Sequence, residues 1–192
     1  DTGNIKDIET YCAIGIIDGV TTNPSLMAKE KGDPREITKR ICEIVKGPVS
    51  AEVIATDVEG MIREGRDLAT IDPHVVITVP FGKAGVHACK ALRAEGIRVN
   101  VTLVFSPAQA LLAAKAGATF VSPFVGRLDD IATDGMELIQ QIVEIYRNYA
   151  FETEVLVASA RHPMHVVAAA LMGADICTCP ASVIEALFRH PL

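Results

Sequence analysis

Short apolar runs rich in β-branched residues alternate along the chain with longer amphipathic runs. The short runs predict strands. Seven strand candidates can be recognised, at residues 16–23, 48–54, 74–80, 98–104, 120–125, 154–160 and 175–180. They begin every 21 to 34 residues, with no linker rich in proline, glycine or serine between them. This spacing is typical of repeated βα units, and it predicts a single domain over residues 1–192 with a parallel sheet and helices outside it.

The longer runs have the period of amphipathic helices, and their ends carry recognisable signals. In the run 134–149, one helical face carries Met136, Ile139, Val143 and Tyr146. Ser106 and Pro107 predict the start of another helix. Four helices are expected to end in a left-handed glycine shortly before a strand, at Gly15, Gly96, Gly117 and Gly173.

The architecture that fits this rhythm best is the (β/α)8 or TIM barrel, which needs eight parallel strands. The sequence shows seven, and a helical pattern follows directly on the opening letters DTGN. We therefore expect the first strand to precede Asp1. An open, doubly wound sheet is the alternative, but no G-x-G-x-x-G turn follows any strand to support it.

Composition narrows the functional classes. The content of 49% hydrophobic and 22% charged residues is that of a folded protein. No apolar run reaches the roughly 18 residues of a membrane-spanning helix, so no membrane partner is expected. The net charge of −6 argues against general nucleic-acid binding. It does not argue against a small anion, because two well-placed arginines suffice for one phosphate.

The cysteine pattern predicts neither disulfides nor a metal site. The five cysteines are Cys12, Cys42, Cys89, Cys177 and Cys179. They include no C-x-x-C pair, and no histidine stands at zinc spacing from them. The pair in "CTC" could chelate a metal, but alternate packing on a strand is favoured. A reducing compartment, by default the cytoplasm, is expected.

Polar residues occur two positions apart, late in the strand candidates. The pairs are Thr21 with Asn23, Ser50 with Glu52, Asn100 with Thr102, Ser159 with Arg161, and Ser122 with the aromatic Phe124. In a barrel, alternate strand residues point inward, and catalysis takes place at the carboxyl ends of the strands. The five pairs are therefore expected to converge on one polar pocket.

Glu52 is the most informative of these residues. A carboxylate inside a barrel costs several kcal/mol unless it is paired or functional. Asp1 would be a second carboxylate, at the end of the strand expected before it. With Thr102 between them, the two could hold and activate a water for proton transfer. The alternative is that Glu52 turns outward and is solvated.

Arg127 and Arg161 follow two neighbouring strand candidates. Their spacing suits a phosphate clamp across adjacent loops, and surface salt bridges are the alternative. His162 and His165 lie near the same end of the strands. No motif supports a metal site there, so they are interpreted as helix-start or rim residues.

Several segments resemble the transaldolase family, in particular its small bacterial branch that includes the fructose 6-phosphate aldolases. The segments are "DGVTTNPSL", "SAEV", "NVTLVFSPAQALLAAKAGATFVSPFVGR" and "ASARHPMHV". The resemblance covers nearly the whole chain in the family's order. It implies a (β/α)8 barrel, a Schiff-base lysine that reacts with a ketose phosphate, a place in the pentose phosphate pathway, and no cofactor. It also implies a homo-oligomer of five or ten subunits and a final helix that would follow "FRHPL".

The resemblance also assigns roles by position. Asp1, Glu52 and Thr102 correspond to the family's proton-transfer and water-holding group, and Arg127 and Arg161 to its phosphate site. The expected contacts to sugar hydroxyls are Thr21, Asn23, Ser50, Asn100, Ser122 and Ser159. The aldolases of the family tend to have Gln in place of Glu52 and Tyr in place of Phe124. Both positions here resemble transaldolase, which favours transfer of the three-carbon unit over its release.

Thr78 departs from the family pattern, because it stands where the resemblance implies the Schiff-base lysine. Alternation places Val76, Thr78 and Pro80 on one face, so Thr78 is expected to point into the pocket. A hydroxyl cannot form an imine, and the covalent route is then closed. Three explanations are open: an engineered Lys→Thr change, a natural homologue that has lost or changed its chemistry, or a nucleophile relocated to Lys83.

The leading functional hypothesis is transaldolase chemistry, which moves a dihydroxyacetone unit from sedoheptulose 7-phosphate to glyceraldehyde 3-phosphate. With Thr78 in place, the activity of this chain is expected to be absent or very low. The alternatives are a fructose 6-phosphate aldolase, a non-catalytic sugar-phosphate binder and a scaffold without a ligand. The buried position expected for Glu52 argues against the scaffold.

Overall fold

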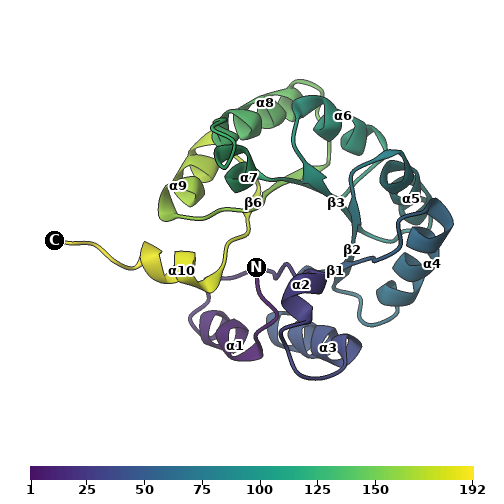
Figure 1. The fold of residues 1–192 in the computed structure, drawn as a ribbon, viewed down its shortest axis with the longest axis horizontal. Coiled ribbons are helices and arrows are strands. Elements are labelled where there is room, and N and C mark those ends of the chain that lie inside the picture. Colours follow the sequence, from purple (N-terminus) through teal and green to yellow (C-terminus); the bar gives the residue numbers. More distant parts are fainter.

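Six parallel strands pair in chain order to form one curled sheet in the computed structural model, which describes all 192 residues (Figure 1). The strands are β1 (Val49–Glu52), β2 (Val75–Pro80), β3 (Val99–Val104), β4 (Phe120–Pro123), β5 (Glu154–Val157) and β6 (Ile176–Cys177). Each strand pairs with the next one along the chain. A doubly wound sheet reverses this order at a switch point, so the observed order excludes that alternative.

The helices lie outside the curled sheet, so that the ribbon forms an open ring with the strands on its inner side (Figure 1). They are α1 (Ile5–Ala13), α2 (Pro24–Met27), α3 (Pro34–Val45), α4 (Val58–Ala69), α5 (Lys83–Ala94), α6 (Pro107–Lys115), α7 (Val125–Asp129), α8 (Gly135–Asn148), α9 (Pro163–Met172) and α10 (Ala181–Leu187). None is long and apolar enough to cross a bilayer. The predicted start at Ser106 is confirmed, since its side chain accepts a hydrogen bond from the Gln109 N–H.

Helix ends follow the glycine signals. All four predicted glycines have φ between +72° and +83°, in the left-handed region. At Gly173 the N–H donates to the Ala170 carbonyl and closes α9 before the chain turns into β6. Glycine adopts this conformation without the steric cost that a Cβ would add.

The strands separate two apolar layers. Residues such as Val49, Ile77 and Val101 belong to the large core between the sheet and the helices. A smaller cluster on the concave side contains Val76, Phe120, Leu156 and Ala158. Because side chains alternate along a strand, the polar residues two positions from these inner residues also face the centre of the ring.

The strand predicted over residues 16–23 is not formed, and this prediction was wrong. Only Val20 makes a parallel bridge, to Val49 of β1. Its main-chain groups pair with Pro48 and Ser50 on that side. On the side of Val20 that faces away from β1, the one main-chain hydrogen bond nearby is from the Thr2 N–H to the Thr21 carbonyl. A segment paired along one edge at a single residue lacks the repeated ladder of a strand.

The last two strands are shorter than predicted. β5 ends at Val157 rather than at residue 160, and β6 covers two residues of the predicted run 175–180. Ser159 has φ +60°, in the left-handed region, which takes the chain out of the extended conformation after β5. Ser159 and Arg161, the polar pair expected late in the strand 154–160, therefore lie in the loop that follows β5.

The turn between β2 and α5 depends on Gly85. An added Cβ would lie 1.9 Å from the Pro80 carbonyl oxygen. We expect Gly85→Ala to destabilise the fold by about 3 kcal/mol, because the backbone must move to relieve this clash. Gly15→Ala is the control: nothing lies within 4 Å of its added Cβ, so only the left-handed backbone costs about 1–2 kcal/mol. Thermal unfolding by circular dichroism checks this order, and an equal loss of Tm in both variants would contradict it.

Candidate active site

Three inner residues form a row across adjacent strands. Glu52 of β1 is the register partner of Thr78 of β2. Thr78 is in turn the register partner of Asn100 of β3. Register partners in a parallel sheet point to the same side. The row therefore places a carboxylate, a hydroxyl and an amide side by side at the centre of the ring.

Thr78 occupies the middle of this row without a partner. Its residue exposure is 4%. Its hydroxyl is buried and is the one side-chain polar atom of that kind with no hydrogen bond. An unsatisfied buried polar group costs about 1–3 kcal/mol. No neighbouring polar group is therefore placed to form a hydrogen bond with a hydroxyl at position 78.

Glu52 is half-buried, and its surroundings disfavour its charge. Desolvation by burial raises the pKa of its carboxyl above the usual range for glutamate. A carboxyl with a raised pKa, beside a row of polar groups, is suited to accept and return a proton.

The raised pKa predicts a stability effect for Glu52→Gln. Because the folded pKa of Glu52 is above its unfolded value, stability is fully present below the unfolded pKa and is lost as the pH rises through the folded pKa. Glutamine carries no charge, so the variant avoids this loss. We expect its Tm at pH 7 to be higher by on the order of 2 °C. The difference should vanish in thermal melts below the unfolded pKa, and a lower Tm for the variant at pH 7 would contradict this account.

The next inner pair joins β3 to β4. The Ser122 hydroxyl donates to the Asn100 side-chain oxygen at 2.9 Å, and both residues are buried. Because this bond uses the amide oxygen, the amide N–H groups of Asn100 remain as donors. Thr102 is buried two residues further along β3. Ser122 therefore fixes the amide of Asn100, which is the register partner of Thr78.

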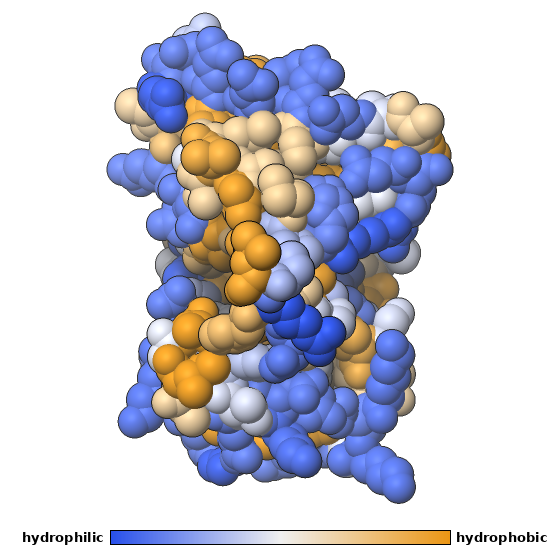
Figure 2. Space-filling model, turned by 90° about the vertical axis from the view of Figure 1, so that its left-hand side faces the viewer, coloured by the Kyte–Doolittle hydropathy of each residue, from blue (hydrophilic) through white to orange (hydrophobic).

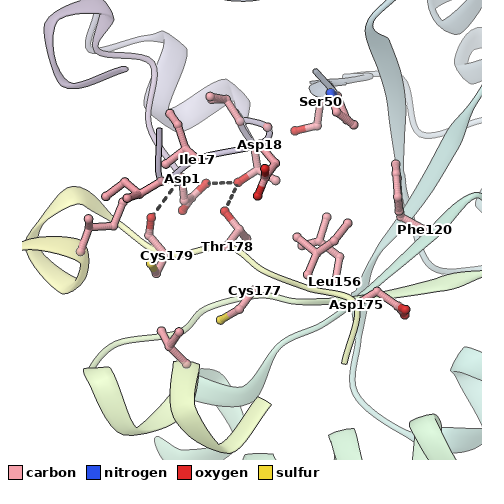
Figure 3. Close-up of a pocket in the computed structure, with 18 of the residues that line it drawn as sticks. Asp1, Ile17, Asp18, Ser50, Phe120, Leu156, Asp175, Cys177, Thr178 and Cys179 are labelled. Atoms are coloured by element: carbon pink, nitrogen blue, oxygen red, sulfur yellow. Dashed lines mark hydrogen bonds between the residues drawn. The ribbon is translucent and has the colours of Figure 1, made fainter. Parts of the chain in front are cut away.

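A second cluster joins the beginning of the chain to the end of β6 (Figure 3). The Thr21 hydroxyl lies 2.7 Å from the Thr178 hydroxyl and donates to an oxygen of Asp1 at 3.0 Å. The main-chain nitrogen of Asp1 donates to the Cys179 carbonyl at 2.9 Å. Thr178 was not predicted as a site residue. Alternation around "CTC" puts it on the inner face, but the run was interpreted through its cysteines.

Two predicted sugar contacts have structural hydrogen bonds. The Asn23 side-chain oxygen accepts from the Leu26 N–H and caps α2. The Ser50 hydroxyl accepts from the Thr22 N–H at 2.9 Å, while the Thr22 hydroxyl donates to the Ser50 carbonyl. These bonds hold the segment before α2 against β1.

A cavity of about 620 Å³ lies between residues 16–21 and the end of β6. Its wall is largely apolar, as Figure 3 shows for Phe120 and Leu156. It includes four predicted residues: Asp1, Thr21, Ser50 and Asn100. It does not include Glu52, Thr78, Thr102 or the two arginines. The predicted residues thus border the concave side without all lining this one cavity.

The two arginines follow β4 and β5, and both lie near the carboxylate of Asp130. Arg127 is in α7, with its guanidinium 5.6 Å from the centre of the Phe124 ring. Phe124 packs edge-on against Phe105 at 5.9 Å. Arg161 follows β5, and its side chain lies against Gly126, where an added Cβ would be 2.6 Å from Nε. α7 and the loop after β5 therefore each bring a guanidinium group near Asp130, and a phosphate can be bound by two such groups.

The sequence pattern did not identify Asp130 as the acidic partner of Arg161. Both terminal nitrogens of Arg161 donate to the carboxylate of Asp130, one of them at 2.6 Å. This bond lowers the pKa of Asp130 and raises that of Arg161. The signal was present in the "GRLDD" run, where α7 places the carboxylates within one turn of Arg127.

Lys83, the alternative nucleophile, is exposed at the first position of α5. It is not in the row of Glu52, Thr78 and Asn100. No group of three or more His, Cys, Asp or Glu side chains is placed to hold a metal ion. The inner face therefore offers acid, hydroxyl and amide groups, together with a pair of guanidinium groups at its rim.

Comparison with known proteins identifies the relatives of this chain. Residues 1–192 match the family model described as transaldolase/fructose-6-phosphate aldolase. A probable transaldolase of Kosmotoga olearia is 60% identical over 192 residues, which is 100% of this chain and 88% of the relative. A probable transaldolase of Desulfosudis oleivorans is 58% identical over 192 residues, covering 100% and 90% of the two chains. One of Chlorobium limicola is 60% identical over 200 residues, with 100% and 90% covered. The chain belongs to the transaldolase/fructose-6-phosphate aldolase family.

Proposed function

We propose that this protein binds ketose phosphates in a transaldolase-type site whose covalent step is blocked. In the full reaction of such a site, a dihydroxyacetone unit passes from sedoheptulose 7-phosphate to glyceraldehyde 3-phosphate. Support comes from the names of the relatives and from the inner polar groups beside an arginine pair. Asp1 and Glu52 would move protons through a water held by Thr102, and Arg127 and Arg161 would bind the phosphate.

The proposal that the covalent step is blocked rests on one observation, the threonine at position 78. It is buried on the inner face, between Glu52 and Asn100, with its hydroxyl unpartnered. This is the position at which a family lysine would meet the substrate carbonyl. Threonine has no amine, so no carbinolamine or imine can form there. A non-catalytic sugar-phosphate binder is therefore the second candidate function, and Thr78 is the observation that favours it.

Intact-protein mass spectrometry tests the blocked step. The protein is incubated with fructose 6-phosphate and borohydride, and calorimetry measures binding of the same ligand. We expect saturable binding without a covalent increase in mass. An adduct on this protein would contradict the proposal, and its mapping to Lys83 would assign the nucleophile to α5 instead. Absence of any binding would contradict both the enzyme and the binder.

When a lysine stands at position 78, we expect this site to favour transfer of the three-carbon unit over its release. Glu52 and Phe124 stand where the aldolases tend to have Gln and Tyr. The raised pKa of Glu52 gives it the capacity to take part in proton transfer. Product analysis of a variant with a restored lysine distinguishes the two: transfer needs an acceptor aldehyde, whereas an aldolase releases dihydroxyacetone without one.

We further propose that the curled sheet belongs to a closed (β/α)8 barrel. The apolar cavity separates residues 16–21 from β6, and β6 pairs only with β5. An additional strand in this gap would pair both edges and fill the apolar space. Hydrogen exchange tests this arrangement. Fast exchange at residues 176–178 indicates an open edge, and slow exchange indicates a closed barrel.

The protein is proposed to be a homo-oligomer that associates through α9 and the end of α10. Met164, Val167 and Leu171 occupy one face of α9 and are 63%, 41% and 83% exposed. Leu187 and Phe188, at the end of α10, are 45% and 64% exposed, and Figure 2 shows a hydrophobic band along this side of the molecule. Exposed apolar patches of this kind are typical of protein interfaces.

Leu171→Glu is expected to reduce the oligomeric state, because a charge would be buried at the interface. Leu112→Glu on α6 is the matched control, since Leu112 is also exposed, at 55%, but lies on another helix. Size-exclusion chromatography with light scattering measures the mass of both variants. A monomeric parent protein, or an unchanged mass for Leu171→Glu, would contradict this interface.

A further inference from the structure

Both ring nitrogens of His165 are engaged, although the residue lies outside the row of candidate site residues. The ring Nδ1 accepts a hydrogen bond from the Arg161 main-chain N–H at 3.1 Å. The Nε2 atom lies 2.9 Å from a carboxylate oxygen of Asp129. The His165 side chain is 6% exposed. A buried histidine with two directed contacts has one defined orientation and one defined tautomer.

The contacts determine where the proton lies. Nδ1 faces an N–H donor, so it must carry a lone pair. The single ring proton of neutral His165 is therefore on Nε2, from which it is donated to Asp129. Burial lowers the pKa of His165, and repulsion from His162 adds to this effect, against the opposing influence of Asp129. The neutral ring is thus the form that fits these surroundings.

His165 ties together the two segments that carry the arginines. Asp129 is the last residue of α7, the helix that contains Arg127. The Arg161 N–H belongs to the loop after β5. The guanidinium of Arg161 is held separately, by Asp130. His165 therefore fixes the main chain of Arg161, and Asp130 fixes its side chain.

The loop that His165 holds needs such a support. Ser159 adopts a left-handed conformation with φ +60°, which is uncommon for a residue with a side chain. The Gly126 N–H donates to the Ser159 carbonyl at 3.2 Å. Together with the His165 bond, this contact fixes both ends of the segment 159–161 against α7.

We propose that neutral His165 is a positioning residue for phosphate binding, which locks the Arg161 loop against α7, and that protonation of His165 releases this lock. The inference rests on the proposed sugar-phosphate function. A protonated ring would turn an Nδ1–H toward the Arg161 N–H, and two donors would then face each other. The charged groups around the ring are Asp129 on α7, His162 at the start of α9, and Arg161 in the loop.

The direction of the pH dependence follows from the lowered pKa. The lock is complete at pH values above the ordinary histidine value of 6.5 and is lost as the pH falls through the lower pKa of folded His165. Affinity for a phosphorylated ligand should therefore fall in acid. The ligand phosphate also titrates at a pKa of about 6. A variant that does not titrate at position 165 separates the two effects.

The experiment compares His165→Asn, His165→Ala and the control His162→Asn. The asparagine oxygen can still accept from the Arg161 N–H but does not titrate. Calorimetry measures fructose 6-phosphate binding between about pH 5 and 8. We expect His165→Ala to weaken binding about tenfold at the upper pH. His165→Asn should retain affinity there and lose the acid-dependent fall beyond that of the ligand. His162→Asn should keep that fall, with its midpoint moved to higher pH because the repulsion that helps lower the pKa of His165 is removed.

Nuclear magnetic resonance provides a readout that needs no ligand. The Arg161 amide shift should titrate with the His165 ring in the parent protein and be flat in His165→Asn. An amide that does not follow the ring, or an acid-dependent fall unchanged in His165→Asn, overturns the inference. Failure of the parent protein to bind fructose 6-phosphate at any pH overturns the proposed function and, with it, the phosphate role of His165. Binding that is normal in His165→Ala overturns the positioning role alone.

Discussion

The variant Thr78→Lys is expected to form a borohydride-stable adduct with fructose 6-phosphate, while the parent protein forms none. The side chain at position 78 is buried on the inner face, so a lysine amine there would be desolvated. Desolvation disfavours the charged ammonium, and the free amine is the nucleophile that attacks the carbonyl. Glu52 is the register neighbour and can relay protons, taking one from the attacking nitrogen and returning one to the hydroxyl that leaves as water when the imine forms. We expect transaldolase turnover to rise by at least about a thousandfold.

Two further variants show whether the amine itself is responsible. Thr78→Val removes the unpartnered hydroxyl without adding a nucleophile, so it should remain inactive and become slightly more stable. Lys83→Ala in the Thr78→Lys background should leave the adduct intact, because Lys83 is exposed on α5 and outside the row. An adduct lost with Lys83, or a Thr78→Lys protein that binds the sugar phosphate but never forms an imine, would contradict this assignment.

The part of the fold that sequence predicts well is the part governed by local periodicity. Apolar alternation located six of the strands, and it placed Thr78 on the same face as Val76, which belongs to the inner cluster. The cap at Ser106 and the four left-handed glycines follow from backbone chemistry that acts within a few residues. Such signals do not depend on distant contacts.

The predictions that failed depend on partners distant in sequence. Residues 16–23 have the composition of a strand, but a strand needs several successive residues paired with a neighbour, and here Val20 alone makes a bridge, to Val49. Sequence likewise identified Arg161 but not its pairing with Asp130, because that bond joins residues in different loops. His165 was interpreted as a rim residue, whereas its ring links Asp129 to the Arg161 main chain. Spacing alone cannot reveal which side chains a tertiary fold brings together.

Arg161→Ala is expected to weaken fructose 6-phosphate binding about a hundredfold and to leave the weak binding of fructose unchanged. Charge-assisted bonds to phosphate are the strongest polar contacts available to this site, at about 1.5–3 kcal/mol each. The guanidinium has five N–H donors, and the bond to Asp130 uses only its two terminal nitrogens. Removing it also leaves Asp130 without its partner, and an unpaired carboxylate next to the phosphate adds repulsion. Calorimetry with both sugars measures the two affinities.

Comparison of the arginine and Asp130 variants distinguishes the lost attraction between arginine and phosphate from the repulsion between Asp130 and phosphate. Arg127→Ala should cost less than Arg161→Ala, because Arg127 stacks on Phe124 and makes no ion pair whose loss would leave a carboxylate behind. Asp130→Asn combined with Arg161→Ala should recover part of the lost affinity, since it removes the repelling charge. The matched control is Arg66→Ala on α4, where an exposed arginine makes a similar two-pronged bond to Glu95; it should leave binding unchanged. If Arg66→Ala weakens binding as much as Arg161→Ala, or if fructose and its phosphate lose affinity equally, the arginine pair is not the phosphate site, and the cation that holds the ligand must lie elsewhere on the concave face.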